Sequence, residues 1–232
     1  MSVLNNNENI DRKWKTLFTV AGISGFVMLF IMILQIIIYI IWPPPETSFD
    51  FFNLFQTNWF LGLLSLDLLY ILNNAILVLI YLALYFSLKD ENESAMLIGM
   101  VMGLIGISAY FASNMAFEML SLSTQYNSAT SEIQKTLLLG AGSALLAIYK
   151  GTAFNVYYVL DAITLLIFSI VMLRSASFRR STAIFGIISG VLMSIPSTAG
   201  IIGLIFSLGS LIPWALFLVL ISIQFLRFGS TN

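Results

Sequence analysis

The chain contains no cysteine and no histidine. Without cysteine there are no disulfides and no thiolate chemistry. Without histidine the chain lacks a common zinc and haem ligand and the side chain best suited to proton transfer at neutral pH. Charged residues are also scarce, at 9% of the 232 residues, and ten Lys and Arg nearly balance eleven Asp and Glu. With no basic excess, the sequence predicts no nucleic-acid partner.

Hydrophobic residues fill much of the chain instead. They make up 59% of it, and the mean hydropathy is +0.96, which lies outside the usual range of soluble domains. The sequence has no HExxH motif, no glycine-rich phosphate loop and no serine with a positioned base. We therefore expect an all-α, polytopic integral membrane protein that is not an enzyme and has no cofactor or metal site.

Six apolar stretches are each long enough to cross about 30 Å of hydrocarbon. A shorter apolar segment, residues 131–150, begins with Ser131 and Gln134 in the spacing of a capping box and is predicted to be an outer-face or re-entrant helix. Residues 1–16 are expected to be a cytoplasmic segment, 17–228 a single transmembrane domain and 229–232 a cytoplasmic tail. The six predicted spans are Leu17–Ile41, Trp59–Leu88, Ala95–Leu120, Ala153–Leu173, Ala183–Phe206 and Leu208–Phe228.

The distribution of basic residues predicts the orientation. With six spans and both termini in the cytoplasm, eight Lys and Arg lie inside and only Lys135 and Lys150 lie outside, as the positive-inside rule requires. The four tryptophans all fall near predicted membrane interfaces, which is typical of an aromatic belt. The predicted location is the plasma membrane. The inner basic residues are Arg12, Lys13, Lys15, Lys89, Arg174, Arg179, Arg180 and Arg227.

Polar side chains gather in the outer halves of the second, third and fourth spans. Asp161 is the one carboxylate in the fourth span, and burying such a group in hydrocarbon costs a few kcal/mol or more, so it usually faces a partner or a cavity. Helical spacing places the polar residues of each span on one stripe, which lipid cannot satisfy. We therefore expect an outward-facing polar cavity. Its candidate lining residues are Asp67, Tyr70, Asn74, Asn114, Glu118, Tyr157, Tyr158 and Asp161.

Simpler roles stay open for several of these residues. Asn73, Asn74 and Asn114 are also the kind of residue that only hydrogen-bonds transmembrane helices to each other. Glu118 and Asp67 also fit positions in the headgroup region, where water would solvate them. Lys150 is either a counter-ion for the cavity or a residue that extends its ammonium to the interface.

Three functions are compatible with this pattern. The favoured one is binding or transport of a small molecule, lipid or ion, with carboxylates, amides and phenols suited to cationic or hydroxyl-rich ligands. The alternative is a regulatory or interaction subunit whose basic loop from Arg174 to Arg180 contacts anionic lipid or a partner protein. The least favoured is an intramembrane enzyme that uses paired carboxylates. Expected partners are membrane lipids, a small-molecule or lipid ligand, and a second copy of the chain in a homodimer.

Several segments also resemble a known family. They are the proline-rich first outer loop and the stretches LDLLYILNNAILVLIYLALYFSLK, YYVLDAITLLIFSIVMLRS and LIPWALFLVLISIQFLRFG. Together they resemble a prokaryotic family of six-span membrane proteins called domain of unknown function 4386, over most of the chain from Leu17 onward. The resemblance implies the six-span topology. It brings no catalytic residues, because the family has none that are agreed.

Overall fold

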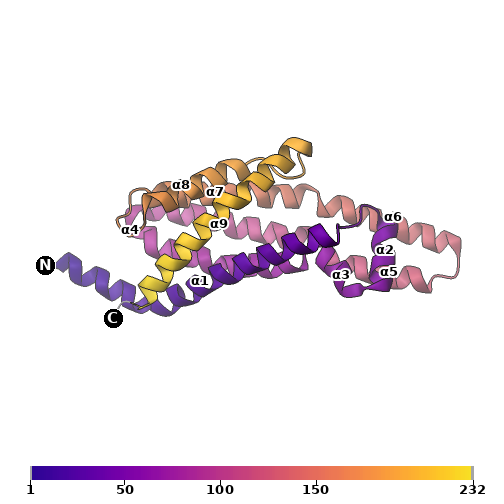
Figure 1. Cartoon of the computed structure of the whole chain (residues 1–232), viewed down its shortest axis with the longest axis horizontal. Helices are drawn as coiled ribbons and strands as arrows, with labels where there is room; N and C mark the ends of the chain where they lie inside the picture. Colours follow the sequence, from indigo (N-terminus) through magenta and orange to yellow (C-terminus); the bar gives the residue numbers. More distant parts are fainter. Residues whose placement is uncertain (1, 231–232) are drawn as a thin grey trace. The chain divides into compact units, whose positions relative to one another are not determined.

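The computed structural model describes residues 2–230, with side chains from Lys13 onward. The described residues form helices and no strand, so the all-α prediction is confirmed (Figure 1). In chain order the helices are α1 Ser2–Ile41, α2 Ser48–Thr57, α3 Trp59–Ser65, α4 Leu68–Ser113, α5 Ala116–Ser128, α6 Glu132–Tyr149, α7 Thr152–Met172, α8 Arg180–Met193 and α9 Gly200–Ser230.

The surface of these helices is largely apolar. Phe30, Ile40 and Ile212 are 65%, 74% and 71% exposed, which is unfavourable in water but expected of side chains that face lipid. Within the described part of the chain, four helical stretches are long and apolar enough to cross a membrane. They are Lys13–Ile41, Leu68–Ser128, Glu132–Met172 and Gly200–Ser230. The chain is thus a membrane-embedded helical protein.

The long helix α4 folds back on itself at Asn92. The backbone there is extended, with φ −164° and ψ 88°, and the Asn92 side chain accepts a hydrogen bond of 3.1 Å from the N–H of Ala95. Tyr81 and Gly103 are equally distant from Asn92 along the chain, and the Tyr81 ring lies so close to Gly103 that a Cβ there would clash with it. Contact between these two residues means that α4 is a hairpin. The charged segment 89–93, between the predicted second and third spans, therefore lies at the turn of this hairpin.

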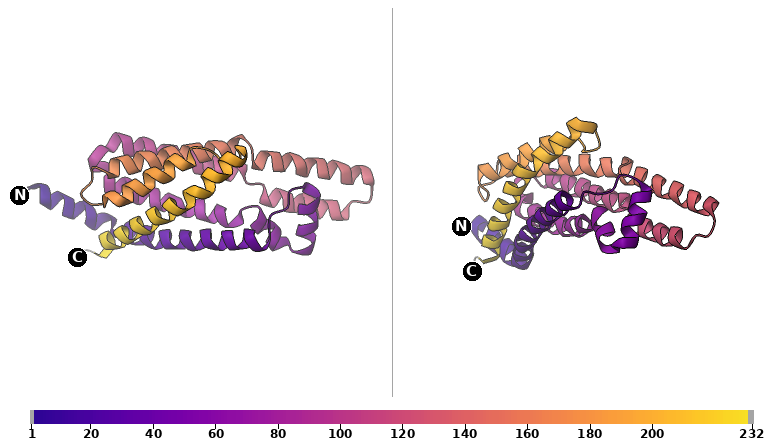
Figure 2. Two further views of the ribbon diagram at one scale, coloured as in Figure 1. Left: turned by 45° about the horizontal axis from the view of Figure 1, so that its top comes forward. Right: turned by 45° about the vertical axis from the view of Figure 1, so that its right-hand side comes forward.

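The C-terminal helices differ from their predicted bounds. The fifth span was expected over Ala183–Phe206, and this is wrong: α8 ends at Met193 and α9 runs from Gly200 to Ser230. Pro196 lies in the break, because it lacks a backbone N–H and disfavours helical geometry in the residue before it. Gly200 begins α9 with a φ of +65°, a conformation that glycine adopts easily. The two helices lie side by side (Figure 2).

The helices divide into two compact units, each with its own core. Unit 1 comprises the residues up to Phe30, Asn74–Ile107 and the residues from Tyr158 onward, and unit 2 comprises Ile31–Asn73 and Ser108–Tyr157. The core of unit 1 is built from large apolar side chains such as Phe168 and Phe217, which are fully buried. The core of unit 2 centres on Phe52 of α2.

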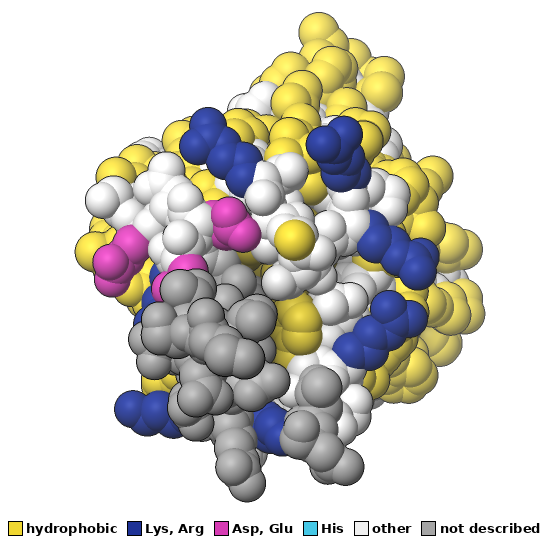
Figure 3. Space-filling view, turned by 90° about the vertical axis from the view of Figure 1, so that its left-hand side faces the viewer, with side chains coloured by type: hydrophobic (Ala, Val, Ile, Leu, Met, Phe, Trp, Pro, Cys, Tyr) yellow, Lys and Arg dark blue, Asp and Glu magenta, His cyan; other side chains and the backbone are white. Residues whose placement is uncertain are grey.

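Aromatic contacts join several helix ends at one end of unit 1. Trp14 stacks on Phe86 with ring centroids 3.7 Å apart, which links the start of α1 to the end of the first half of α4. Phe178, between α7 and α8, contacts Phe228 near the end of α9 at 5.7 Å, and Phe18 also contacts Phe228. Lys and Arg side chains surround this end of the unit (Figure 3). Each of these four segments carries a basic residue beside its aromatic one: Lys13, Lys89, Arg179 and Arg227.

Unit 2 contains a small helical cap formed by α2, α5 and α6. Helix α6 begins as predicted, because the Ser131 hydroxyl accepts a hydrogen bond from the N–H of Gln134. It packs on α2, where the Ser48 hydroxyl donates to the carbonyl of Leu139 at 3.1 Å. Ser123 of α5 donates to the carbonyl of Phe52 at 3.0 Å. The segment that was expected to be an outer-face or re-entrant helix is thus one wall of this cap.

Candidate functional site

The centre of unit 2 is a break between two helices. Helix α3 ends at Ser65 and α4 begins at Leu68, so the predicted second span is interrupted at Leu66 and Asp67. Asp67 has φ 62° and ψ 31°, and within residues 2–230 it is the one non-glycine residue with a positive φ. This left-handed conformation costs about 1–2 kcal/mol in general, although aspartate tolerates it better than most residues. Strain of this kind persists where the surrounding contacts fix it.

Two side-chain amides donate hydrogen bonds to the backbone carbonyls that the helix break leaves without helical partners. Gln35 of α1 donates through Nε2 to the carbonyl of Leu64 at 3.2 Å, and Asn114 donates through Nδ2 to the carbonyl of Leu66 at 2.8 Å. A helix interrupted at membrane depth needs such partners, because lipid offers none. Gln35 and Asn114 are thus positioning residues that hold the strained turn.

The carboxylate of Asp67 is held by two tyrosines from helices distant in the sequence. The Tyr39 hydroxyl donates to Oδ1 at 2.5 Å, and the Tyr149 hydroxyl donates to Oδ2. The side chain is half-buried. Among the residues with described side chains, the one salt bridge is the surface pair Lys135–Glu132, so none of these residues is a cationic partner of Asp67.

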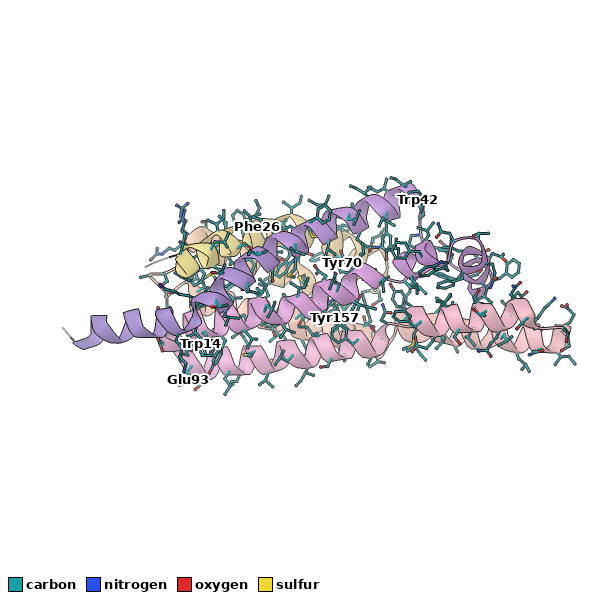
Figure 4. All side chains as sticks on the ribbon, turned by 90° about the horizontal axis from the view of Figure 1, so that it is seen from below. Trp14, Phe26, Trp42, Tyr70, Glu93 and Tyr157 are labelled. Carbon is teal, nitrogen blue, oxygen red and sulfur yellow. The ribbon has the colours of Figure 1, made fainter. Side chains whose placement is uncertain are left out.

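Three further tyrosines lie next to this group of residues. Asp67, Tyr39, Tyr70 and Tyr157 all lie close enough to Tyr110 to act electrostatically on its hydroxyl. The rings of Tyr110 and Tyr157 are 4.8 Å apart and inclined by 53°. Tyr70 and Tyr157 are labelled on their helices in Figure 4. Together, Tyr39, Tyr70, Tyr110, Tyr149 and Tyr157 form what we call the tyrosine cluster, which holds five of the nine tyrosines in the chain.

The other predicted cavity residues of unit 2 have different surroundings. Asn114 supports the helix break, and its Oδ1 also accepts from the N–H of Ala116 at 3.1 Å. Glu118 is exposed on the first turn of α5, where the positive end of the helix dipole favours a carboxylate. Lys150, one candidate counter-ion, is exposed beside Tyr149.

Asn74, Tyr158 and Asp161 belong to unit 1. Asp161 is 3% exposed, and Tyr81 lies close enough to its carboxylate to act as a hydrogen-bond donor, although the geometry of this contact is poor. A Cβ on Gly106 would lie 2.8 Å from Oδ1, so the carboxylate packs directly on the backbone of α4. Tyr158 shares a hydrogen bond of 2.6 Å with Ser207 of α9. A single cavity that joins Asp161 to Asp67 stays a prediction.

Sequence reasoning missed the two tyrosines that hold Asp67. Tyr39 follows Gln35 by four residues, so both lie on one face of α1, and this spacing was a usable signal. Tyr149 lies at the end of an apolar run and gave no such signal. Within the described residues, no group of three or more acidic, cysteine or histidine side chains is placed to hold a metal ion.

Comparisons with protein-family models, with curated proteins and with solved structures gave no match to this chain. The resemblance to the family of six-span proteins therefore stays a prediction from the quoted segments. The site has a carboxylate bound by two phenol hydroxyls at a strained helix break, and no described side chain is its counter-ion.

Proposed function

We propose that the chain is a six-span protein of the plasma membrane, with both termini in the cytoplasm, that binds or transports a small molecule at Asp67. The resemblance to domain of unknown function 4386 is part of this proposal. The gathering of Lys13, Lys89, Arg179 and Arg227 at one end of unit 1 supports the orientation, because these residues were assigned to one side of the membrane.

One observation carries the functional part of the proposal. Asp67 lies in a strained, interrupted helix, and its charge has no partner of opposite sign among the described side chains. Interrupted helices in membrane proteins are typical of sites where transporters bind substrates and ions near the middle of the bilayer. An ionisable residue in such a place indicates function, because it costs stability unless something binds it.

The site is tested by native mass spectrometry of the detergent-purified protein. We expect the wild-type chain to carry a co-purifying mass that is lost in Asp67→Asn and kept in Asp50→Asn, a matched change at an exposed carboxylate of α2. An Asp161→Asn variant shows whether the second carboxylate contributes to the same site. An empty wild-type chain would contradict the proposal and favour an interaction subunit instead.

The topology is tested with introduced cysteines, which the natural sequence allows without background because it has none. Single cysteines at the exposed positions Ser177 and Ser128 are expected to react with a membrane-impermeant maleimide from opposite sides of intact cells. Labelling of both from the same side would contradict the six-span arrangement.

A further inference from the structure

We propose that the site at Asp67 takes an organic cation with an ammonium head group that carries N–H donors. This inference rests on the proposed binding function and names its ligand class. It follows from the charge at the break, from the hydrogen-bonding groups left over around it, and from the rings that border it.

Unit 2 contains buried amide oxygens that lack a hydrogen-bond donor. The Oε1 atom of Gln35 is buried and has no hydrogen-bond partner, while the Nε2 of the same amide is fixed on the carbonyl of Leu64. The Oδ1 of Asn73 is also buried without a partner, one helical turn beyond Tyr70. Asp67 itself, as a carboxylate, only accepts. Buried acceptors without donors are costly, and a ligand that brings several N–H groups would satisfy them.

The same contacts disfavour a metal ion. Hard cations need several oxygen ligands, and in interrupted membrane helices these are commonly backbone carbonyls freed by the break. Here the carbonyls of Leu64 and Leu66 already accept from Gln35 and Asn114. The break therefore offers one carboxylate, while two of its backbone carbonyls are already occupied. This arrangement fits a single charged head group better than a bare ion.

The tyrosine cluster supplies the remaining recognition. Cations bind favourably over the faces of aromatic rings, most strongly where water is excluded. Tyr110 is 2% exposed and its hydroxyl has no hydrogen-bond partner, so it provides both a ring and a further polar group at the site. Because the rings and the carboxylate lie together, they can contact the alkyl and charged parts of one small ammonium ion.

The ligand series for the test is built on one alkyl chain. Isothermal titration calorimetry on the full-length wild-type protein compares butylammonium with butan-1-ol, butyrate and butyltrimethylammonium. We expect butylammonium to bind about tenfold or more tightly than the alcohol and the quaternary ion, because charged hydrogen bonds are the difference, and butyrate not to bind. Equal binding of the alcohol would overturn the charge requirement. Equal binding of the quaternary ion would overturn the requirement for N–H donors.

Variants locate the binding on the protein. Asp67→Asn is expected to abolish butylammonium binding, and Tyr110→Phe, which keeps the ring, to weaken it several-fold. Tyr126→Phe is the matched control, since this tyrosine contacts Phe52 in the helical cap and lies outside the tyrosine cluster. Unchanged binding in both Asp67→Asn and Tyr110→Phe would overturn the site. If Asp67→Asn does not fold, the ligand series and Tyr110→Phe still decide the question.

Ammonium groups occur in free amines and in the lipid phosphatidylethanolamine. Binding measurements in nanodiscs of different lipid composition distinguish these two sources. In nanodiscs of phosphatidylglycerol alone, butylammonium binds in either case. Added phosphatidylethanolamine competes with it only if the lipid head group enters the site. The two proposals also fail separately. A co-purifying neutral or anionic species lost in Asp67→Asn would keep the binding function and overturn the ammonium class.

Discussion

Replacing Asp67 with Ala, Gly or Asn separates the cost of the strained backbone from the value of the tyrosine hydrogen bonds. Ala and Gly both remove the acceptor of two phenol hydroxyls, and hydrogen bonds to charged groups contribute about 1.5 kcal/mol or more each. Because Asp67 is half-buried, we take the lower value and expect Asp67→Ala to lower the free energy of unfolding by about 3 kcal/mol. Asp67→Asn keeps one acceptor and tolerates the left-handed conformation, so its loss is smaller.

Glycine at the same position relieves the strain that a Cβ causes at positive φ. Asp67→Gly should therefore be about 1 kcal/mol more stable than Asp67→Ala. A second position in the chain gives a reference value for this difference in stability between glycine and alanine. Gly200 has a φ of +65°, and a Cβ added there would meet no atom within 4 Å, so Gly200→Ala measures the same backbone term without steric contacts.

The measurement is chemical unfolding in detergent micelles, followed by circular dichroism. The difference between the two Asp67 variants is expected to match the loss caused by Gly200→Ala within a few tenths of a kcal/mol, as holds for independent sites. If Asp67→Gly were no more stable than Asp67→Ala while Gly200→Ala lost stability, the reasoning about strain at the helix break would be refuted.

Other changes test the cap and the hairpin. Gly142→Ala should destabilise the fold by about 1–2 kcal/mol, because its Cβ would lie 2.9 Å from a buried phenylalanine of α2. Gly140→Ala, in the same helix with open space around it, should instead stabilise by up to about 1 kcal/mol. Ser123→Ala should cost about 1–3 kcal/mol in chemical unfolding, since it removes two hydrogen bonds of the Ser123 hydroxyl, one donated to the carbonyl of Phe52 and one accepted from Nε2 of Gln56. Asn92→Ala should lower the thermal midpoint through loss of a cap of about 1 kcal/mol, and Asp90→Ala, an exposed neighbour, should not.

Long apolar runs predicted that the chain is helical and embedded in a membrane, because they leave few alternatives in lipid. The second, third and fifth predicted spans, however, run through breaks at Asp67, at Asn114 and between α8 and α9. The charged turn near Asn92 and the capped start of α6 at Ser131 were both identifiable from residue type and spacing. The break at Asp67 was not. Leu66 and Asp67 have neither proline nor glycine beside them, and the left-handed turn depends on amides from Gln35 and Asn114, which are distant in the sequence.

The sequence predicted one residue of the candidate site but missed its hydrogen-bond partners, which are also distant in the sequence. Asp67 was identified from its charge, since a carboxylate in an apolar run is conspicuous. Its partners Tyr39 and Tyr149 were not, because tyrosine is common near membrane interfaces and carries no charge to mark it. Asp161 was equally conspicuous, yet it packs on Gly106 in the core of unit 1. Composition locates unusual residues, but only tertiary contacts show which of them lie together.

The short helix α8 has a consequence for the surrounding lipid. Its 14 residues extend about 21 Å, well short of a hydrocarbon layer of about 30 Å. In the proposed topology, the polar turn around Ser194 and Ser197 would then lie below the outer surface of an undeformed bilayer. Hydrophobic mismatch of this size is relieved when the membrane thins locally or when a neighbouring helix tilts. The edge of the protein at α8 would thus be a place where the outer leaflet bends inward and the bilayer is thinner than elsewhere.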